Sequence, residues 1–220
     1  MRVAVAGGNG KVAVRLTRLL TGRGDEVRSL IRSAERAGDV RAAGGEPVIC
    51  DLEAASVGEV GEGVDGADAV VFAAGAGPGS GPERKWTVDY GGAVKLIDAA
   101  RAQGSSRYVM LSSIGADADR EGEETFDVYL RAKGRADAEL SGSGLAYTIV
   151  RPVHLTDEPG TGLVRLGQQV GRGEISRDDV AAVLAAVLAQ PAIPRATFEV
   201  ASGEQSVEEA VASLHSAAGN

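Results

Sequence analysis

The sequence predicts an α/β fold with a doubly wound parallel sheet, and two observations lead to this prediction. Short runs rich in valine, isoleucine and alanine alternate about six times with segments whose apolar residues recur at helical spacing. The first such run breaks into a glycine turn and then restarts as a helix. Right-handed crossovers then give the strand order 3-2-1-4-5-6, with a possible seventh strand. We expect one domain over residues 1–220, in which residues 151–220 add a small substrate lobe.

The composition is that of an ordinary globular protein, with 44% hydrophobic and 25% charged residues. No apolar run reaches the length of a membrane span and Met1 leads directly into a strand, so we expect a cytoplasmic protein without membrane contact. A net charge of −8 without a basic stripe argues against a nucleic-acid partner. The single cysteine, Cys50, is expected as a buried thiol, and with only His154 and His215 as histidines we expect no metal site. The oligomeric state is expected to be a monomer or a homodimer.

The glycine turn after the first strand predicts a phosphate site. A strand that feeds a tight turn and then a helix leaves the first helical N–H groups unpaired and directed at whatever lies above the turn. One glycine makes the turn, another permits close backbone approach, and the small Ala13 lets the helix pack on the strand. The alternative is an ordinary strand-to-helix turn in a chain with 31 glycines. The residues expected to contact a dinucleotide here are Gly7, Gly8, Asn9, Gly10, Lys11 and Val12.

The end of the second strand, residues 26–31, predicts which dinucleotide binds. Arg32 follows this strand about 20 residues after the glycine turn, where an NAD-selective site carries an acid for the ribose 2′-hydroxyl. An arginine instead offers a planar, charged fork to a 2′-phosphate. The sequence therefore favours NADP(H), with a solvated surface arginine as the alternative.

Three later strand ends carry small or polar residues. Asp51 and Leu52 follow the third strand, where the acid accepts a hydrogen bond from an adenine amino group or caps the next helix. The fourth strand is apolar throughout and ends in small residues, which form a flat surface for a cofactor or merely a flexible loop. The remaining residues expected against the cofactor are Ala73, Ala74, Gly75, Ser112, Lys133, Pro152 and Val153.

Periodicity and stop signals place the other elements. Residues 114–124 read as a polar loop over the carboxyl edge of the sheet, and after Pro152 the periodic pattern loosens into a glycine-rich stretch up to Gly173. The expected helices cover residues 10–22, 33–43, 55–64, 83–103, 125–140, 176–190 and 206–216. The expected strands after the second cover residues 46–50, 69–74, 107–111, 145–150 and 196–201.

Tyr129 and Lys133 stand four residues apart in a predicted helix and therefore share one helix face. A positive charge beside a phenol favours its ionised form, which suits a general acid or base. Lys133 would also hold the nicotinamide ribose. The alternative is a tyrosine packed on the sheet and a solvated lysine.

These motifs, together with residues 147–152 (Tyr-Thr-Ile-Val-Arg-Pro), resemble the atypical short-chain dehydrogenase/reductases. The chain looks most like the compact NAD(P)H-binding proteins of the epimerase/dehydratase subgroup, almost from end to end, and residues 141–152 and 155–160 are typical of that subgroup. The resemblance implies a Rossmann fold.

In the wider superfamily a tyrosine, a lysine, a serine and an asparagine act together, which implies Tyr129, Lys133 and Ser113 here. Asp89 stands in the place of the asparagine, an exchange that some atypical relatives share.

The leading functional hypothesis is an NADP(H)-dependent oxidoreductase or epimerase that transfers hydride to or from a small carbonyl or hydroxyl substrate. The segment after residue 151 leaves little surface for a large nucleotide sugar. Two alternatives stay open: a non-catalytic NADP(H)-binding redox sensor, which Asp89 favours, and a flavin or quinone reductase of the biliverdin reductase B-like type.

Overall fold

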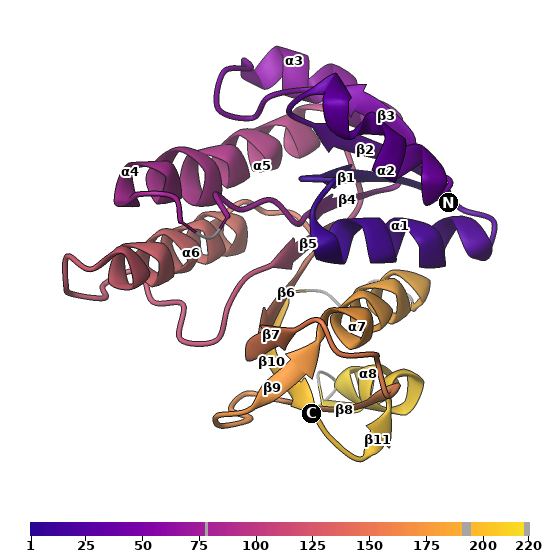
Figure 1. Cartoon of the computed structure of the whole chain (residues 1–220), viewed down its shortest axis with the longest axis vertical. Helices are drawn as coiled ribbons and strands as arrows, with labels where there is room; N and C mark the ends of the chain where they lie inside the picture. Colours follow the sequence, from indigo (N-terminus) through magenta and orange to yellow (C-terminus); the bar gives the residue numbers. More distant parts are fainter. Residues whose placement is uncertain (78, 191–194, 218–220) are drawn as a thin grey trace.

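The computed structural model describes residues 1–77, 79–190 and 195–217, with side chains through residue 214. The expectations for the His215 side chain lie outside this part. The described chain forms a nine-stranded sheet of order β11-β8-β10-β6-β5-β4-β1-β2-β3, in which the predicted order 3-2-1-4-5-6 is confirmed (Figure 1). The expected seventh strand is β10, which runs parallel to β6.

The parallel strands form because their residues are apolar on both faces, as a sheet covered by helices on both sides requires. All four residues of β4, Ala69–Phe72, are buried, and so are four of the five residues of β1, Arg2–Ala6. The other parallel strands are β2 (Glu26–Ile31), β3 (Glu46–Ile49), β5 (Tyr108–Leu111), β6 (Tyr147–Pro152) and β10 (Ala196–Ser202).

Helices cover both faces of this sheet and give it two cores. On one face, α1 (Lys11–Gly22) packs against α7 (Arg177–Ala189), which also contacts α8 (Val207–Ala217) (Figure 1). On the other face, α5 (Ala93–Ala102) lies between α3 (Val57–Val64) and α6 (Thr125–Gly142). The short α2 (Ala37–Ala42) follows a 3₁₀ turn at Ala34–Arg36.

The helix expected over residues 83–103 is helical along its length but is not one regular α-helix. It begins as α4, Pro82–Arg84, winds as a π-helix over Lys85–Gly92 and continues as α5. Apolar spacing does not distinguish a π turn from an α turn within so short a segment, and π turns are common at functional sites.

The glycine-rich stretch up to Gly173, where the periodic pattern loosens, leads into short strands that the sequence did not predict. The chain forms β7 (His154–Thr156), β8 (Leu163–Gly167) and β9 (Glu174–Ser176). β8 runs antiparallel to β10 and to the short β11 (Gln205–Ser206), while β7 and β9 pair as a separate small sheet. These strands are too short to give a periodic signal, and pairing with distant segments holds them in place.

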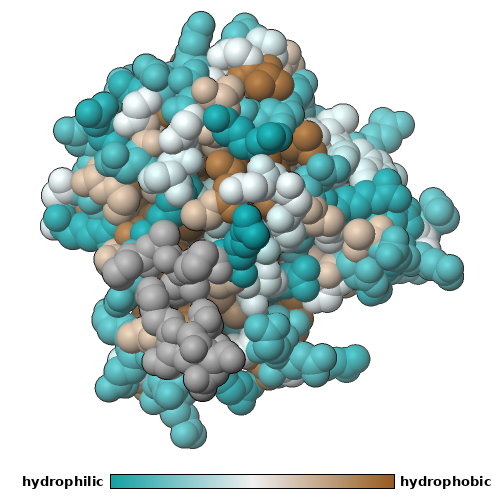
Figure 2. Space-filling model, turned by 180° about the vertical axis from the view of Figure 1, so that it is seen from behind, coloured by the Kyte–Doolittle hydropathy of each residue, from teal (hydrophilic) through white to brown (hydrophobic). Residues whose placement is uncertain are grey.

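Polar residues dominate the surface, and Figure 2 shows hydrophobic residues only in small separate spots on the face that it presents. Within the described residues, no helix combines the length and the apolar character that crossing a bilayer requires. The predicted burial of the Cys50 thiol is confirmed.

Candidate active site

A cavity of about 880 Å³ opens at the carboxyl ends of β1, β2, β4 and β5, where open α/β sheets bind ligands. Most of the residues expected in the site line this one cavity. They are Gly7, Asn9, Gly10, Lys11, Val12, Arg32, Asp51, Leu52, Ala73, Ala74, Gly75, Asp89, Ser112, Tyr129 and Lys133.

The glycine turn has the geometry of a cradle for a diphosphate. Gly7 has a φ of +75°, and a Cβ there would lie 2.5 Å from the Cα of Ala74, so only glycine fits. Gly10 is the N-cap of α1, and its N–H donates to the carbonyl of Gly7 at 2.8 Å. No side chain caps this helix and no acid lies in its first turn, which suits an anion at its start.

Three of the expected cofactor residues, Gly8, Pro152 and Val153, do not line the cavity. A Cβ on Gly8 would overlap the Ser29 side chain, so this glycine is needed for packing against β2. Pro152 lies in β6, opposite Val200 of β10, and the N–H of the buried Val153 donates to the Val200 carbonyl. Both residues therefore pair with the added strand β10 and do not line the cavity, which corrects the prediction that they contact the cofactor.

The serine that faces the cavity is Ser112, not Ser113. The Ser113 hydroxyl donates to the neighbouring Ile114 carbonyl at 3.2 Å, and Ser113 lies outside the cavity lining. Adjacent side chains of an extended segment point to opposite sides, so only one serine of the pair can face the site. Of the two serines, Ser112 is therefore the one placed to contact a ligand in the cavity.

At the β2 end of the cavity, Arg32 is joined by Ser33 and Arg36, which the strand-end argument missed. Arg32 and Arg36 are exposed, and Arg36 pairs with Asp39 at 3.2 Å. The second arginine, four residues after Arg32, was a signal available in the sequence. The guanidinium groups of these two arginines can donate hydrogen bonds to a phosphate at this edge of the cavity.

Asp51 lines the cavity and accepts the N–H of Glu53 at 3.0 Å. The alternative that it caps the next helix is wrong, because Ser56 caps α3 in a capping box with Glu59. Glu53 pairs with Arg84 at 2.5 Å, and this hydrogen bond lowers the pKa of the glutamate. Both residues of this pair line the cavity, and tertiary folding alone brings them together.

Lys133 and Asp89 form a buried ion pair at the opposite end of the cavity. The Lys133 Nζ lies 3.4 Å from Asp89 Oδ1, and the two side chains are 4% and 1% exposed. The ammonium also donates to the carbonyls of Ala74 and Leu111 at 3.4 and 3.3 Å, while Asp89 Oδ2 accepts the N–H of Ala76 at 3.1 Å. The alternative of a solvated lysine is therefore wrong.

The Asp89 carboxylate keeps the lysine charged. Burial by itself would lower the pKa of Lys133, but Asp89, Tyr129 and Asp137 outweigh burial and raise the pKa above its ordinary value. The positive charge is consequently shared between Asp89 and the phenol of Tyr129, rather than directed at the phenol alone.

Tyr129 stands beside a second aromatic ring at the cavity wall. The rings of Phe126 and Tyr129 stack with centroids 6.0 Å apart, and Phe126 is 61% exposed although it lines the cavity. The Lys85 Nζ lies 5.6 Å from the centroid of the Tyr129 ring and donates to the Gly77 carbonyl. An aromatic face and a cation thus border the site, and neither Phe126 nor Lys85 was predicted from the sequence.

Asp137 fixes the orientation of the Ser112 hydroxyl. Ser112 Oγ donates to Asp137 Oδ2 at 2.9 Å, and Arg151 donates to the same oxygen from Nε at 2.9 Å. Burial raises the pKa of Asp137, and the charge of Arg151 opposes that shift. Because the one hydroxyl proton of Ser112 points at Asp137, its lone pairs can accept a hydrogen bond from a ligand. Asp137 follows Lys133 by four residues, a spacing that could have revealed it.

The model of a family described as NAD(P)H-binding matches residues 7–191. The chain belongs to this family. The cavity fits the family's cofactor, since the glycine cradle, the arginine edge and the Lys133 end line one continuous space.

Relatives within and near this NAD(P)H-binding family agree with the resemblance to atypical short-chain dehydrogenase/reductases. The chain is 37% identical to the "Uncharacterized sugar epimerase YhfK" of Bacillus subtilis (strain 168), over 97% of this chain and 100% of that protein. The structure of the "Putative NAD-dependent epimerase/dehydratase" from Bacillus halodurans has a TM-score of 0.89 and 38% identity, covering 97% and 99% of the two chains. The oxidoreductase ylbE from Lactococcus lactis has a TM-score of 0.84 and 26% identity, covering 97% and 96%.

Proposed function

We propose that this member of the NAD(P)H-binding family is an NADP(H)-dependent oxidoreductase or epimerase that acts on a small carbonyl or hydroxyl substrate. One observation carries the proposal: a single cavity has Arg32 and Arg36 at one end and Tyr129, Lys133 and Ser112 at the other. The first end suits the 2′-phosphate of NADP(H), and the second end suits proton transfer to or from a substrate oxygen. The bound nicotinamide would supply the hydride donor or acceptor.

The residues of the chain then bind, orient and move a proton. Tyr129 gives the proton to the substrate oxygen in reduction or takes it in oxidation, at its Oη. Lys133, held by Asp89, places a positive charge on the same helix face as Tyr129 and borders the site of the nicotinamide ribose. Ser112, oriented by Asp137, accepts a hydrogen bond from an N–H or O–H group of the cofactor or substrate.

The stacked Phe126 and Tyr129 favour a second candidate, a flavin or quinone reductase. A flat conjugated substrate would lie against the exposed Phe126 ring, since aromatic rings prefer offset stacking. In that reaction hydride transfer suffices, and Tyr129 acts as a surface rather than as an acid.

The redox sensor is the third hypothesis. NADPH binding without turnover of any tested substrate would support it.

The experiment for cofactor choice is a binding titration of NADPH and NADH. Arg32→Ala should weaken NADPH binding by about 1.5–3 kcal/mol, the scale of a hydrogen bond to a charged group, and leave NADH nearly unchanged. Arg41→Ala is the matched control, because Arg41 is an exposed arginine of the neighbouring α2 that does not line the cavity. Equal losses for both cofactors in Arg32→Ala would discard the NADP(H) preference.

The experiment for reaction class is NADPH oxidation against a panel of carbonyl compounds, flavins and quinones. Turnover of carbonyl compounds that depends on Tyr129 supports the leading proposal. Turnover of flavins or quinones that persists in Tyr129→Phe supports the second candidate.

A further inference from the structure

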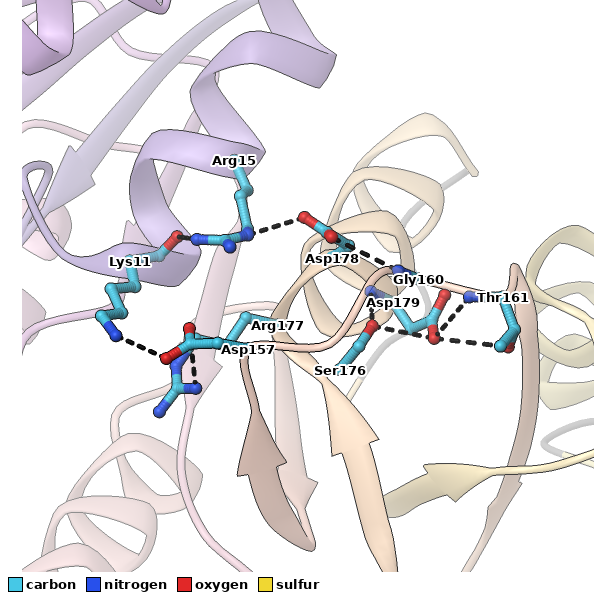
Figure 3. Close-up of polar contacts among 9 residues, drawn as sticks. All are labelled: Lys11, Arg15, Asp157, Gly160, Thr161, Ser176, Arg177, Asp178 and Asp179. Atoms are coloured by element: carbon cyan, nitrogen blue, oxygen red, sulfur yellow. Dashed lines mark hydrogen bonds and ion pairs between the residues drawn. The ribbon is translucent and has the colours of Figure 1, made fainter.

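Two cations at the cavity edge share one carboxylate. The Lys11 Nζ lies 2.5 Å from Asp157 Oδ2, and an Arg177 guanidinium nitrogen lies 3.1 Å from Asp157 Oδ1 (Figure 3). Lys11 and Arg177 both line the cavity, although α1 and α7 are separated by more than half of the chain. The hydrogen bond from Lys11 lowers the pKa of Asp157, so this carboxylate is ionised at neutral pH.

The backbone that follows Asp157 is held in place by two other acids. The buried Asp179 accepts the N–H groups of Thr161 and Gly162 at 3.1 and 2.8 Å. Asp178 accepts the N–H of Gly160 at 3.3 Å and also pairs with Arg15 of α1 at 2.6 Å (Figure 3). Residues 160–162 are therefore tied to α7, and through Asp178 to α1, whereas the ion pairs to Lys11 and Arg177 are the side-chain contacts described for Asp157.

The bond that Asp157 makes is easily exchanged. The Lys11 and Asp157 side chains are 64% and 51% exposed, and an ion pair between exposed side chains contributes little to stability. A carboxylate released from such a pair regains water at little cost. A phosphate offers more charge and more acceptor oxygens than the aspartate, so it would take over both cations.

We infer that Lys11 and Arg177 form an anion subsite of the cavity, and that Asp157 occupies this subsite until an anionic ligand displaces it. The ligand group is a phosphate or a carboxylate. It comes from the cofactor diphosphate or from an anionic substrate; the first source rests on the proposed function. Residues 155–160, a stretch typical of the subgroup, thereby gain a role: they place an internal competitor against Lys11, which begins α1 directly after the glycine turn.

The first test is NADPH titration of Asp157→Asn. Removing the competitor should tighten binding by about fivefold, the effect of one unit charge at about 4 Å in water. Glu158→Gln is the matched control, because it removes one charge from the adjacent exposed residue, for which the described structure shows no ion pair. An equal gain in NADPH affinity in both variants would mean that net charge alone explains the effect, and it would overturn the role of Asp157 as a competitor.

The second test removes the cations and identifies the source of the anion. Arg177→Gln and, separately, Lys11→Gln are titrated with NADPH, and their NADPH-saturated forms are then titrated with inorganic phosphate. About tenfold weaker NADPH binding in both variants identifies the cofactor diphosphate. If the variants bind NADPH normally and lose only the binding of inorganic phosphate to their NADPH-saturated forms, the anion belongs to a substrate. No change in either titration overturns the subsite.

These outcomes remain separate from the proposed function. If the unaltered protein binds neither NADPH nor NADH, the proposed function fails, and inorganic pyrophosphate is titrated into the free protein instead. Pyrophosphate binding that Arg177→Gln abolishes would still support the subsite, whereas no binding, or binding that is unchanged in the variant, would overturn it.

Discussion

At the scale of single residues, Asp89 and Lys133 depend on each other, because each is an almost fully buried charge. Asp89→Asn should lower the free energy of unfolding by about 3–5 kcal/mol, since it leaves the ammonium without its counter-charge. Adding Lys133→Met should recover most of that loss, because a neutral pair of similar volume needs no compensation. Urea unfolding of both single variants and the double variant measures this coupling. Strictly additive losses would show that the pair does not act as a unit.

Tyr129 carries the second prediction at this scale. Tyr129→Phe should keep its NADPH affinity and lower the turnover of a carbonyl substrate by about 10²–10⁴, the usual share of general acid catalysis. Steady-state NADPH oxidation measures turnover, and fluorescence titration measures affinity. Tyr90→Phe is the control, since that hydroxyl donates to Glu139 outside the cavity. Full activity in Tyr129→Phe would exclude the tyrosine as the proton donor.

Sequence reasoning succeeded at residues whose role follows from a strand end or a helix face. Arg32 follows a strand and Tyr129 precedes Lys133 by one helical turn, so local geometry places all three in the cavity. The choice between Ser112 and Ser113 failed, because it depends on which way the strand end turns. Arg177 could not be predicted, since only the packing of α7 on α1 brings it to the site.

At the scale of elements, α6 is held against the loop before it by a glycine. A Cβ on Gly134 would overlap the backbone of Asp117 and Ala118, so the loop and the helix touch without an intervening side chain. Gly134→Ala should therefore lower the free energy of unfolding by about 1–3 kcal/mol, the cost of overpacking.

Gly142→Ala, at the end of the same helix, is the control because nothing lies within 4 Å of the added methyl group. Its stability should stay unchanged or rise by up to about 1 kcal/mol, since alanine favours helix more than glycine does. Chemical denaturation measures both variants. Equal free energies of unfolding for Gly134→Ala and Gly142→Ala would show that the loop moves aside for the added methyl group without loss of stability.

The elements themselves were predictable in proportion to their burial. The central strands β1, β4, β5 and β6 are covered on both faces, which leaves an apolar run in the sequence, whereas β3 lies at the edge of the sheet and is only partly buried. Strands β7, β8 and β9 have at most five residues and derive their order from pairing with partners elsewhere in the chain. No local pattern specifies such a strand.

At the scale of the whole molecule, the described residues after 151 share a hydrophobic core with the first half of the chain. One hydrophobic core joins Val5 and Leu16 to Leu184 and Phe198. Arg107, which precedes β5, donates to the carbonyls of Val187, Leu188 and Gln190 at the end of α7, and Arg23 donates to that of Ala185. Both halves of the chain thus supply the packing and the polar contacts that hold α7.

Such sharing predicts one cooperative unfolding transition, because neither half keeps its core alone. Native-state hydrogen exchange should give the slowest amides of β1 and of α7 the same free energy of opening. NADPH at 100 times its dissociation constant should raise the free energy of opening by about 2.7 kcal/mol for the amides of both elements. We expect this although the glycine cradle and the arginine edge lie in the first half of the chain. A rise confined to β1 would show that residues 151–220 unfold independently of the cofactor-binding half. A common rise would mean that ligand binding at the glycine turn stabilises the entire chain.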